Sequence, residues 1–299
     1  MDATNLRIEH LKTIDQFRAC EDLQRQAWGM DDRDVVPLHL LVTLEKNGGL
    51  VLGAFDDRGE LVGTLFGFLG AIDRSAGPRP ASLSPSGTKH CSHMMGVRED
   101  WRGCGVGYRL KCAQREHALR QGLNLVSWTF DPLESLNASL NIRKLGATCS
   151  TYLRDLYGEM RDQRNMGLGS DRFRLDWWVA SRHVAERLEG AHPESSLKAY
   201  LDRGAVLLNE AEAGTGRLRD CFPPSLPPKV DLIAVEIPAD IQSMKTTDLQ
   251  QARRWRACTR EIFESAFGAG YTVVDFVSEV KDGARRSFYL LQRGFEVDR

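Results

Sequence analysis

A short run of glycines between an apolar segment and an amphipathic segment constrains the fold more than any other feature of this sequence. The run is Arg102-Gly103-Cys104-Gly105-Val106-Gly107, and it follows the apolar stretch from His93 to Val97. Tyr108 to Gln121 then carries apolar residues at helical spacing, and Leu123 to Phe130 is apolar again. A strand, helix, strand order takes a right-handed crossover, so we expect parallel strands with the glycine turn at the carboxyl end of the first.

Glycines at such a turn let backbone N–H groups approach an anion that side chains would otherwise keep away. The N-terminus of the following helix adds favourable partial positive charge. The run is not a P-loop, because no Gly-Lys-Ser/Thr follows it, and its G-x-G-x-G spacing differs from the dinucleotide-binding fingerprint. Taken alone, Gly105 and Gly107 have the alternative interpretation of an ordinary tight turn.

Two motifs in this region resemble the GNAT (N-acetyltransferase) superfamily. Arg102-x-x-Gly105-x-Gly107 is similar to the family's R/Q-x-x-G-x-G/A loop, and Met95 to Trp101 resembles its fourth strand. Asn137 to Ala147 resembles the family's next helix, with Ala147 in place of a usual aromatic residue. The motifs cover Met95 to Ala147, and the order of elements extends the resemblance to about residue 181.

The resemblance implies a GNAT-type α/β (α+β) fold, with a mixed central sheet flanked by helices, and an acyl-CoA cofactor such as acetyl-CoA or succinyl-CoA. Backbone groups of Met95 and Val97 would pair with the pantetheine arm. Asn137 would lie near the pantetheine or thiol, with a helix N-cap as the alternative role. The pyrophosphate would be held by the loop, namely Arg102, Gly103, Cys104, Gly105, Val106, Gly107 and Tyr108.

Catalysis by such a protein needs a base for the attacking amine and an acid for the leaving thiolate. Aligned on Gly146, the tyrosine that commonly serves the family as acid falls at Ile142, which has no proton to donate. Tyr152 is the nearest phenol in the next segment, and packing is its alternative role. His93 is expected on the same strand face as Met95 by the two-residue period, as base or water-positioning group, with a structural histidine as the alternative.

The sequence predicts no metal site and no disulfide framework. In His90-Cys91-Ser92-His93 an extended chain points the two imidazoles to opposite faces, and no second ligand pair follows. Cys149 is expected to be a buried thiol instead of a nucleophile. The cysteines are odd in number and scattered, which indicates reduced thiols in a cytoplasmic protein: Cys20, Cys91, Cys104, Cys112, Cys149, Cys221 and Cys258.

The order of expected elements in the second half of the chain resembles part of the first half and suggests a degenerate half-repeat. We predict a GNAT domain over 1–181, a helical segment with a Pro-rich linker over 182–229, and a degenerate half-GNAT-like subdomain over 230–299. In the last, Leu232 to Ile237 and Thr272 to Val277 read as strands around a helix that opens with a capping box at Thr247 to Gln250. Its loop, Ala239 to Thr246, has no glycine, so no second CoA site is expected there. Four arginines on this helix suggest a solvated helix face, with a contact to an acidic substrate or to CoA phosphates as the alternative: Arg253, Arg254, Arg256 and Arg260.

Composition narrows the partners. The formal net charge is -1. The sequence lacks a basic patch interleaved with aromatic residues, which argues against a nucleic-acid substrate. No stretch approaches the ~18 apolar residues of a membrane helix. The resemblance to the GNAT superfamily implies an acyl-CoA-dependent N-acyltransferase that acts by direct transfer on a small-molecule amine such as an amino acid. A homodimer is an open expectation. The alternatives are a non-catalytic acyl-CoA-binding or assembly protein and a nucleotide-binding module.

Overall fold

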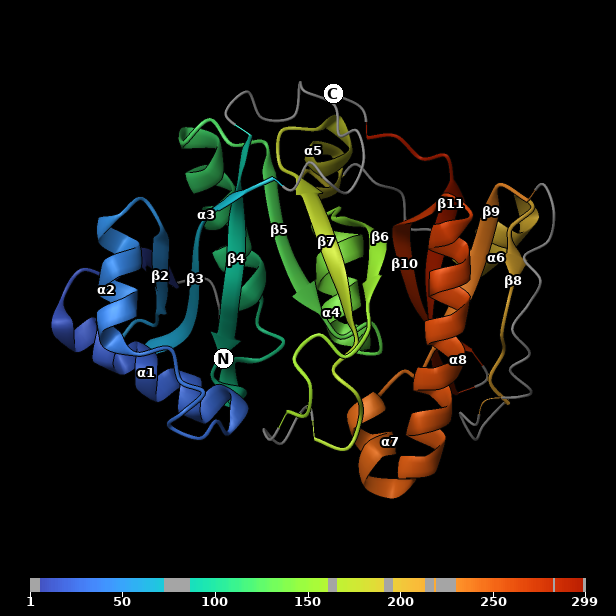
Figure 1. Cartoon of the computed structure of the whole chain (residues 1–299), viewed down its shortest axis with the longest axis horizontal. Coiled ribbons are helices and arrows are strands. Elements are labelled where there is room, and N and C mark those ends of the chain that lie inside the picture. Colours follow the sequence, from blue (N-terminus) through green and yellow to red (C-terminus); the bar gives the residue numbers. More distant parts are fainter. Residues whose placement is uncertain are drawn as a thin grey trace. The chain divides into compact units, whose positions relative to one another are not determined.

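The structure is a computed structural model, and it describes residues 6–72, 87–160, 166–190, 196–212, 218, 230–281 and 283–297. The described residues form two compact units (Figure 1). Unit 1 contains 6–128 and 178–180, and unit 2 contains 129–160, 166–177 and the described residues from 181 onwards. The predicted domain limits at residues 181 and 229 remain predictions, and the predicted linker Phe222 to Lys229 lies outside the described residues.

Unit 1 is built on a mixed sheet with the strand order β1-β2-β3-β4-β5. Neighbouring strands from β1 to β4 are antiparallel, whereas β4 and β5 are parallel, as predicted from the crossover. The elements are β1 (Arg7–His10), α1 (Ile14–Trp28), α2 (Leu38–Lys46), β2 (Leu50–Phe55), β3 (Leu61–Ala71), β4 (Thr88–Val97), the 3₁₀ turn η3 (Glu99–Trp101), α3 (Val106–Arg120) and β5 (Leu125–Phe130).

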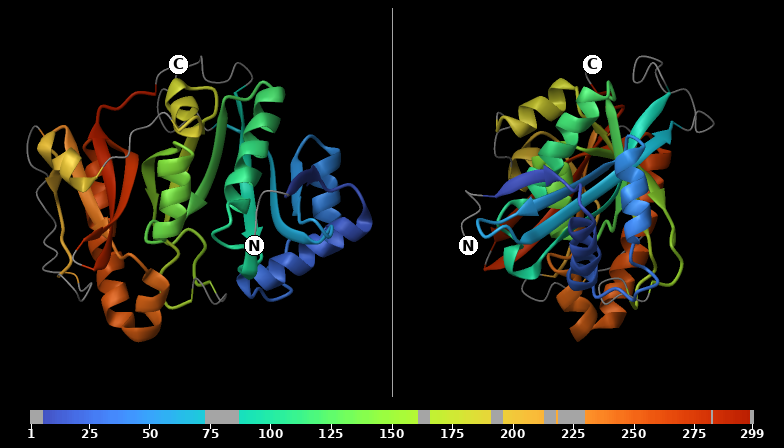
Figure 2. Two further views of the ribbon diagram at one scale, coloured as in Figure 1. Left: turned by 180° about the vertical axis from the view of Figure 1, so that it is seen from behind. Right: turned by 90° about the vertical axis from the view of Figure 1, so that its left-hand side faces the viewer.

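Helices cover both faces of this sheet. Figure 1 shows α1 and α2 on the near side, and the view from behind shows α3 on the other (Figure 2). Strand β3 contributes to both cores, because Leu65 packs with Val106 and Leu110 of α3, whereas Phe66 packs with Phe17 of α1. A mixed sheet flanked by helices confirms the predicted α/β class.

Unit 2 has the strand order β7-β6-β10-β11-β9-β8, in which only β8 and β9 of the described pairs are parallel. The predicted strand, helix, strand order is present as β9, α8 and β10. Unlike β4 and β5, however, β9 and β10 are not neighbours, since β11 pairs with both. The elements are α4 (Ser135–Ala138), the π-helical turn η4 (Ser139–Lys144), β6 (Thr148–Leu153), β7 (Arg172–Trp178), α5 (Arg182–Leu188), α6 (Leu197–Asp202), β8 (Val206–Leu207), β9 (Leu232–Ile237), α7 (Ile241–Thr247), α8 (Leu249–Gly268), β10 (Tyr271–Lys281) and β11 (Ala284–Arg293).

Two local features of unit 2 differ from the sequence prediction. The helix expected around Asn137 to Ala147 has only one α-helical turn before it widens into a π-helix, an i to i+5 pattern that apolar spacing does not signal. The cap of α8 is Asp248 and not Thr247, because the Asp248 carboxylate accepts the Gln251 N–H at 3.0 Å.

The core of unit 2 is aromatic where α8 meets the sheet. Phe263 of α8 lies edge-on to Phe173 of β7, with ring centroids 4.7 Å apart, and to Tyr289 of β11 at 5.4 Å. On the same helix Cys258 is disulfide-bonded, so the prediction that all cysteines are reduced is wrong for this residue. None of the helices in the described part combines the length and apolar character that crossing a bilayer requires.

Candidate functional site

The glycine run forms the turn between η3 and α3, as predicted. Gly103 and Gly105 have φ angles of +80° and +82°, and Gly105 is the N-cap of α3. A Cβ atom added at either glycine would meet nothing within 4 Å, so the turn faces open space. The first-turn N–H groups of an α-helix have no acceptor within the helix, and the first turn of α3 has no acidic side chain. The turn therefore presents free N–H groups to any anion that enters this space.

The side chain of Arg102 is held against α1 by a hydrogen bond. Its Nη2 donates to the carbonyl oxygen of Ala27, in the last turn of α1, at 2.7 Å. The guanidinium thus links the glycine turn to α1, and the backbone of Arg102 is the part that belongs to the turn.

Strand β4 carries a β-bulge at His93. Phe66 of β3 pairs with Met94 and the next residue, Gly67, pairs with Ser92, so His93 is the extra residue. The bulge changes the phase of the side chains. Ser92 and Met95 lie on the α3 face, because Ser92 accepts from Lys111 and Met95 packs in the α3 core.

The opposite face of β4 holds the bulged residue. The His93 ring lies 5.8 Å from the Phe66 ring and 5.9 Å from the Phe68 ring, and Met94 packs in the α1 and α2 core with Phe66. The expectation that His93 and Met95 share a strand face is therefore wrong, because the two-residue period assumed a regular strand.

His93 combines an accessible position with a neutral ring. Its side chain is exposed, yet the surrounding atoms partly desolvate the imidazole and lower its pKa below the ordinary value of 6.5. A neutral imidazole is the form that accepts a proton.

Strands β4 and β5 are paired over a short stretch. The parallel pairs in the described chain are His90 with Val126 and Cys91 with Ser127, near the start of β4. From Ser92 to Val97 the β5 side of β4 is left without paired residues, and this stretch contains Met95 and Val97. Backbone groups along an unpaired strand edge are available to a ligand.

Tyr152 and Asn137 belong to unit 2. The Tyr152 hydroxyl donates to Asp171 at 2.6 Å, and burial raises the pKa of the phenol well above its usual range. Burial alone would raise the pKa of Asp171, but hydrogen bonds from Arg260 and Tyr152 outweigh it and lower that pKa. Asn137 is exposed in α4, whose N-cap is Glu134, so the alternative role of Asn137 as the helix cap is wrong.

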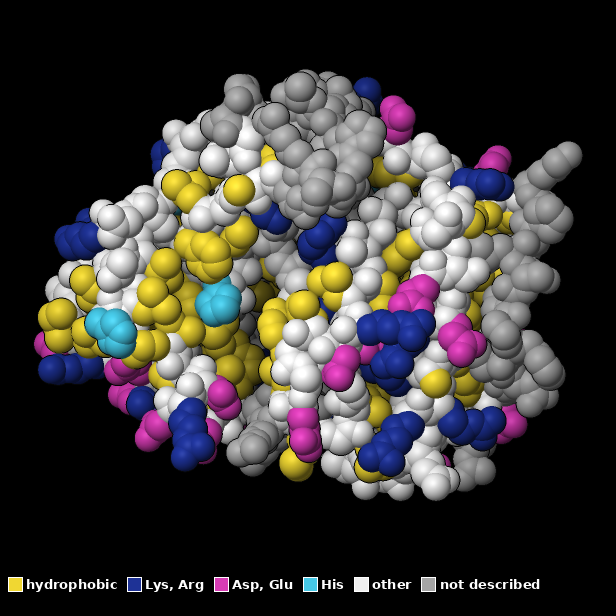
Figure 3. Space-filling view, viewed as in Figure 1, with side chains coloured by type: hydrophobic (Ala, Val, Ile, Leu, Met, Phe, Trp, Pro, Cys, Tyr) yellow, Lys and Arg dark blue, Asp and Glu magenta, His cyan; other side chains and the backbone are white. Residues whose placement is uncertain are grey.

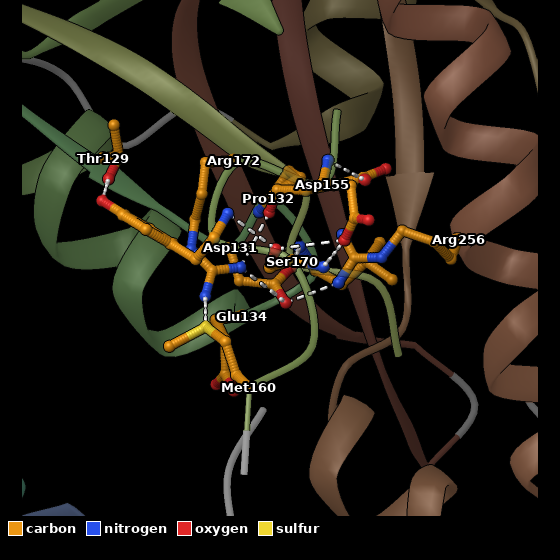
Figure 4. Close-up of polar contacts among 12 residues, drawn as sticks. Thr129, Asp131, Pro132, Glu134, Asp155, Met160, Ser170, Arg172 and Arg256 are labelled. Atoms are coloured by element: carbon orange, nitrogen blue, oxygen red, sulfur yellow. Dashed lines mark hydrogen bonds and ion pairs between the residues drawn. The ribbon is translucent and has the colours of Figure 1, made fainter. Parts of the chain in front are cut away.

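The arginines of α8 do not form a uniform solvated face. Arg256 is buried and donates to Asp131 at 2.5 Å, while Arg172 lies 3.8 Å from the same carboxylate (Figure 4). Arg253 and Arg254 are exposed, and the surface over α8 mixes basic and acidic side chains (Figure 3). The interpretation as a solvated face is thus correct for Arg253 and Arg254 and wrong for Arg256.

Sequence reasoning missed a buried polar cluster on the α3 face of unit 1. Lys111 Nζ donates to Ser92 Oγ at 2.9 Å and to Gln114 Oε1 at 3.1 Å, and it lies 3.5 Å from the centre of the Trp128 ring. Desolvation lowers the pKa of Lys111 well below its ordinary value. Polar residues three positions apart on the buried side of a helix were the available signal, but the same pattern is usual on exposed helices.

His90 lies beside this cluster with its ring fully buried. Desolvation, together with the nearby His117 and Lys111, lowers its pKa to about 3. Neither ring nitrogen has a hydrogen-bond partner in the described part of the chain. Gly67 makes room for the ring, because a Cβ there would approach His90 Nε2 to 2.5 Å.

Within the described residues, no group of three or more His, Cys, Asp or Glu side chains is placed to hold a metal ion. Burial raises the pKa of the Cys149 thiol far above its usual range, so this residue is protonated at neutral pH. Ile142, at the position of the family's usual acid, is fully buried.

No protein-family model and no curated protein matches the sequence. Solved structures that match include the NatC complex bound to Gag peptide and CoA, at 14% identity and a TM-score of 0.42 over 58% of this chain and 98% of that chain. An N-acetyltransferase from Staphylococcus aureus matches at 14% identity and a TM-score of 0.43, over 59% and 99% of the two chains. Arabidopsis thaliana NAA60 matches at 13% identity and a TM-score of 0.45, over 58% and 98%. All three are N-acetyltransferases, but values this low decide neither activity nor substrate.

Proposed function

We propose that the protein is an acyl-CoA-dependent N-acyltransferase, with acetyl-CoA as the first acyl donor to test and a small-molecule amine such as an amino acid as acceptor. The observation that carries the proposal is the glycine turn before α3. Two glycines with positive φ, open space around them and free first-turn N–H groups make an anion site suited to the pyrophosphate of CoA. The motif resemblance from Met95 to Ala147 supports the same ligand.

Strand β4 supplies the second support. Among the described residues its edge from Ser92 to Val97 is not paired with β5, and we assign the pantetheine arm to backbone groups of Met95 and Val97 on this edge. An N–H group on this edge would also stabilise the oxyanion that forms when an amine attacks the thioester carbonyl.

Direct transfer then needs two proton movements. The amine nitrogen forms a bond to the carbonyl carbon, the carbon–sulfur bond breaks, the amine loses a proton and the thiolate gains one. We assign the amine proton to the neutral imidazole of His93, directly or through a water. Tyr152 is the proposed acid, and its hydroxyl would have to break its hydrogen bond to Asp171 before it could protonate the thiolate.

Titration calorimetry with acetyl-CoA and succinyl-CoA tests the cofactor site. A Gly105→Trp variant should lose binding, since the indole would fill the space in front of the turn. Gly59→Trp is the matched control, because Gly59 also has a φ of +80° and open space around it but lies in the turn between β2 and β3. Binding that survives in Gly105→Trp, or no binding by the intact protein, would sink the proposal.

Thiol release from acetyl-CoA across a panel of amines separates the enzyme from the alternative, a non-catalytic acyl-CoA-binding protein. The buried Ile142 in place of an acid is the observation that favours the alternative. Acyl-CoA binding without thiol release for any amine would establish the binding protein instead.

His93→Gln tests the catalytic assignment. We expect kcat to fall by about 10² to 10⁴-fold with acyl-CoA affinity unchanged, the usual loss when a general base is removed. Because its pKa is lowered below 6.5, the acidic limb of the intact enzyme's profile should lie below that pH and disappear in the variant. His39→Gln on α2, where the histidine is exposed, is the control. An unchanged kcat in His93→Gln would remove His93 from the mechanism.

A further inference from the structure

Unit 2 contains a pocket of about 640 Å³ that the proposed acyl transfer does not use. Among the described residues, its polar lining consists of Arg143, Arg285, Ser135, Ser139, Ser196 and Ser278, and none of the described lining residues carries a carboxylate. We propose that this arginine–serine pocket binds a small ligand through an anionic phosphate or carboxylate group.

The pocket lies beside the part of β10 that is not paired with β6 among the described residues. Strand β10 pairs with β6 at Val273 alone among the described residues, whereas it pairs with β11 along its whole length. The η4 turn lies against the open part of β10, where Arg143 donates to the carbonyl oxygen of Phe276 at 3.2 Å. The backbone edge of β10 therefore holds the guanidinium of Arg143, a residue that lines the pocket.

The two arginines differ from the buried or partly buried arginines of unit 2 that form ion pairs. Arg187, Arg256 and Arg286 each have a carboxylate partner within 2.7 Å, namely Asp275, Asp131 and Glu236. Arg143 and Arg285 have no carboxylate partner among the described residues, although both line one pocket. Two guanidinium groups that share a pocket repel each other, and an anion between them removes that repulsion and provides hydrogen-bond acceptors.

A chain of hydrogen bonds between serine hydroxyl groups reaches the pocket and leaves one hydroxyl proton free to donate. Ser135 Oγ lies 2.8 Å from Ser287 Oγ, Ser287 donates to Ser278 Oγ at 3.2 Å, and Arg285 donates to the same Ser278 oxygen at 3.3 Å. Because Ser278 accepts from both neighbours, its own proton is left for another acceptor. A hydroxyl with a free proton beside two guanidinium groups selects an acceptor with negative charge and disfavours a cation.

The size of the pocket fits a metabolite and not only a bare ion, since small-molecule pockets measure about 300–1,000 Å³. Phosphate and carboxylate groups share the recognition chemistry described here, because both accept two parallel hydrogen bonds from one guanidinium. The identity of the anionic group is therefore left to experiment.

Calorimetric titration of the full chain with inorganic phosphate, and separately with succinate, tests the proposal at low ionic strength. We expect at least one of the two anions to bind. Arg285→Gln should weaken that binding at least tenfold, and Arg285 suits substitution because its side chain is exposed. Ser278→Ala should weaken it as well. Arg254→Gln is the matched control, since Arg254 is an exposed arginine of unit 2 that does not line the pocket.

The glycine turn is a second anion site by proposal, so the same titrations are repeated with Gly105→Trp. Binding that persists in Gly105→Trp and weakens in Arg285→Gln supports the arginine–serine pocket, whether or not acyl-CoA binds at the turn. Binding that is lost in Gly105→Trp and retained in Arg285→Gln overturns it. The absence of binding by both anions to the intact protein overturns it too.

Discussion

His90 illustrates how a single buried residue can make stability depend on pH. Its ring is buried against Gly67, its nitrogens have no hydrogen-bond partner in the described part of the chain, and its pKa is lowered to about 3. The unfolded chain has an ordinary histidine pKa near 6.5. Between these values the unfolded state binds more protons than the folded state, so stability is complete above pH 6.5 and is lost as the pH falls toward 3.

This difference in bound protons between the unfolded and folded states predicts how the free energy of unfolding changes with pH. His90 should account for a loss of at most about 1.4 kcal/mol of unfolding free energy per pH unit in that window. His90→Leu should therefore have a shallower acid limb, with stability at pH 7.5 unchanged or higher, because an apolar side chain leaves no nitrogen unsatisfied. Urea denaturation of both proteins from pH 4 to pH 7.5 measures this. Parallel acid limbs would show that His90 does not titrate on unfolding in this range.

At the scale of elements, the carboxylate of Asp275 joins the short helices α5 and α6 to strand β10. Arg187 of α5 donates to Asp275 of β10 at 2.7 Å, and the hydroxyl of Tyr200, in α6, donates to the other Asp275 oxygen at 2.5 Å. All three side chains are buried. Helices of six and seven residues are too short to be stable alone, so their positions depend on this carboxylate.

Asp275→Ala should lower the free energy of unfolding by about 3–5 kcal/mol, because it leaves the Arg187 charge buried without its partner. Chemical denaturation measures the loss. The double variant Arg187→Met, Asp275→Ala should regain much of it, since the unpaired charge is removed as well. If the double variant is as unstable as the sum of the two single variants, the cost does not come from the unpaired charge.

The elements also show where sequence reasoning succeeds and fails. The turn before α3 and the parallel pair β4 and β5 follow from local spacing, which the sequence displays directly. The bulge at His93 and the π-helical turn over Ser139–Lys144 do not, because each adds one residue to a period that the pattern assumes to be constant. The cluster around Lys111 was missed because polar spacing on a helix does not reveal which face is covered.

At the scale of the whole chain, each of the two compact units contains hydrophobic clusters of its own. In unit 1 Leu65 and Phe66 lie in cores on the two faces of one sheet, and in unit 2 Tyr200, Val277 and Phe288 form part of another core. The sequence did not indicate that β11 would lie between β9 and β10, because strand pairing between distant segments depends on competition among all available edges.

The division into two compact units predicts that each unit unfolds in its own transition. Differential scanning calorimetry should show two transitions. At a hundredfold excess over its dissociation constant, acetyl-CoA should stabilise unit 1 by about 2.7 kcal/mol and so raise the temperature of the transition that belongs to this unit. Asp275→Ala should lower only the other transition. A single transition that both changes shift together would show that the units unfold as one.

The bulge in β4 has a consequence for how this gene can change in length. Loss of one codon within a strand normally reverses the inside and outside faces of everything that follows. Removal of His93 would instead leave Ser92 opposite Gly67 and Met94 opposite Phe66, so the two flanking halves would keep their present partners. The strand is therefore expected to tolerate a one-residue deletion at this position. The deleted residue would be His93, to which we assign the role of general base.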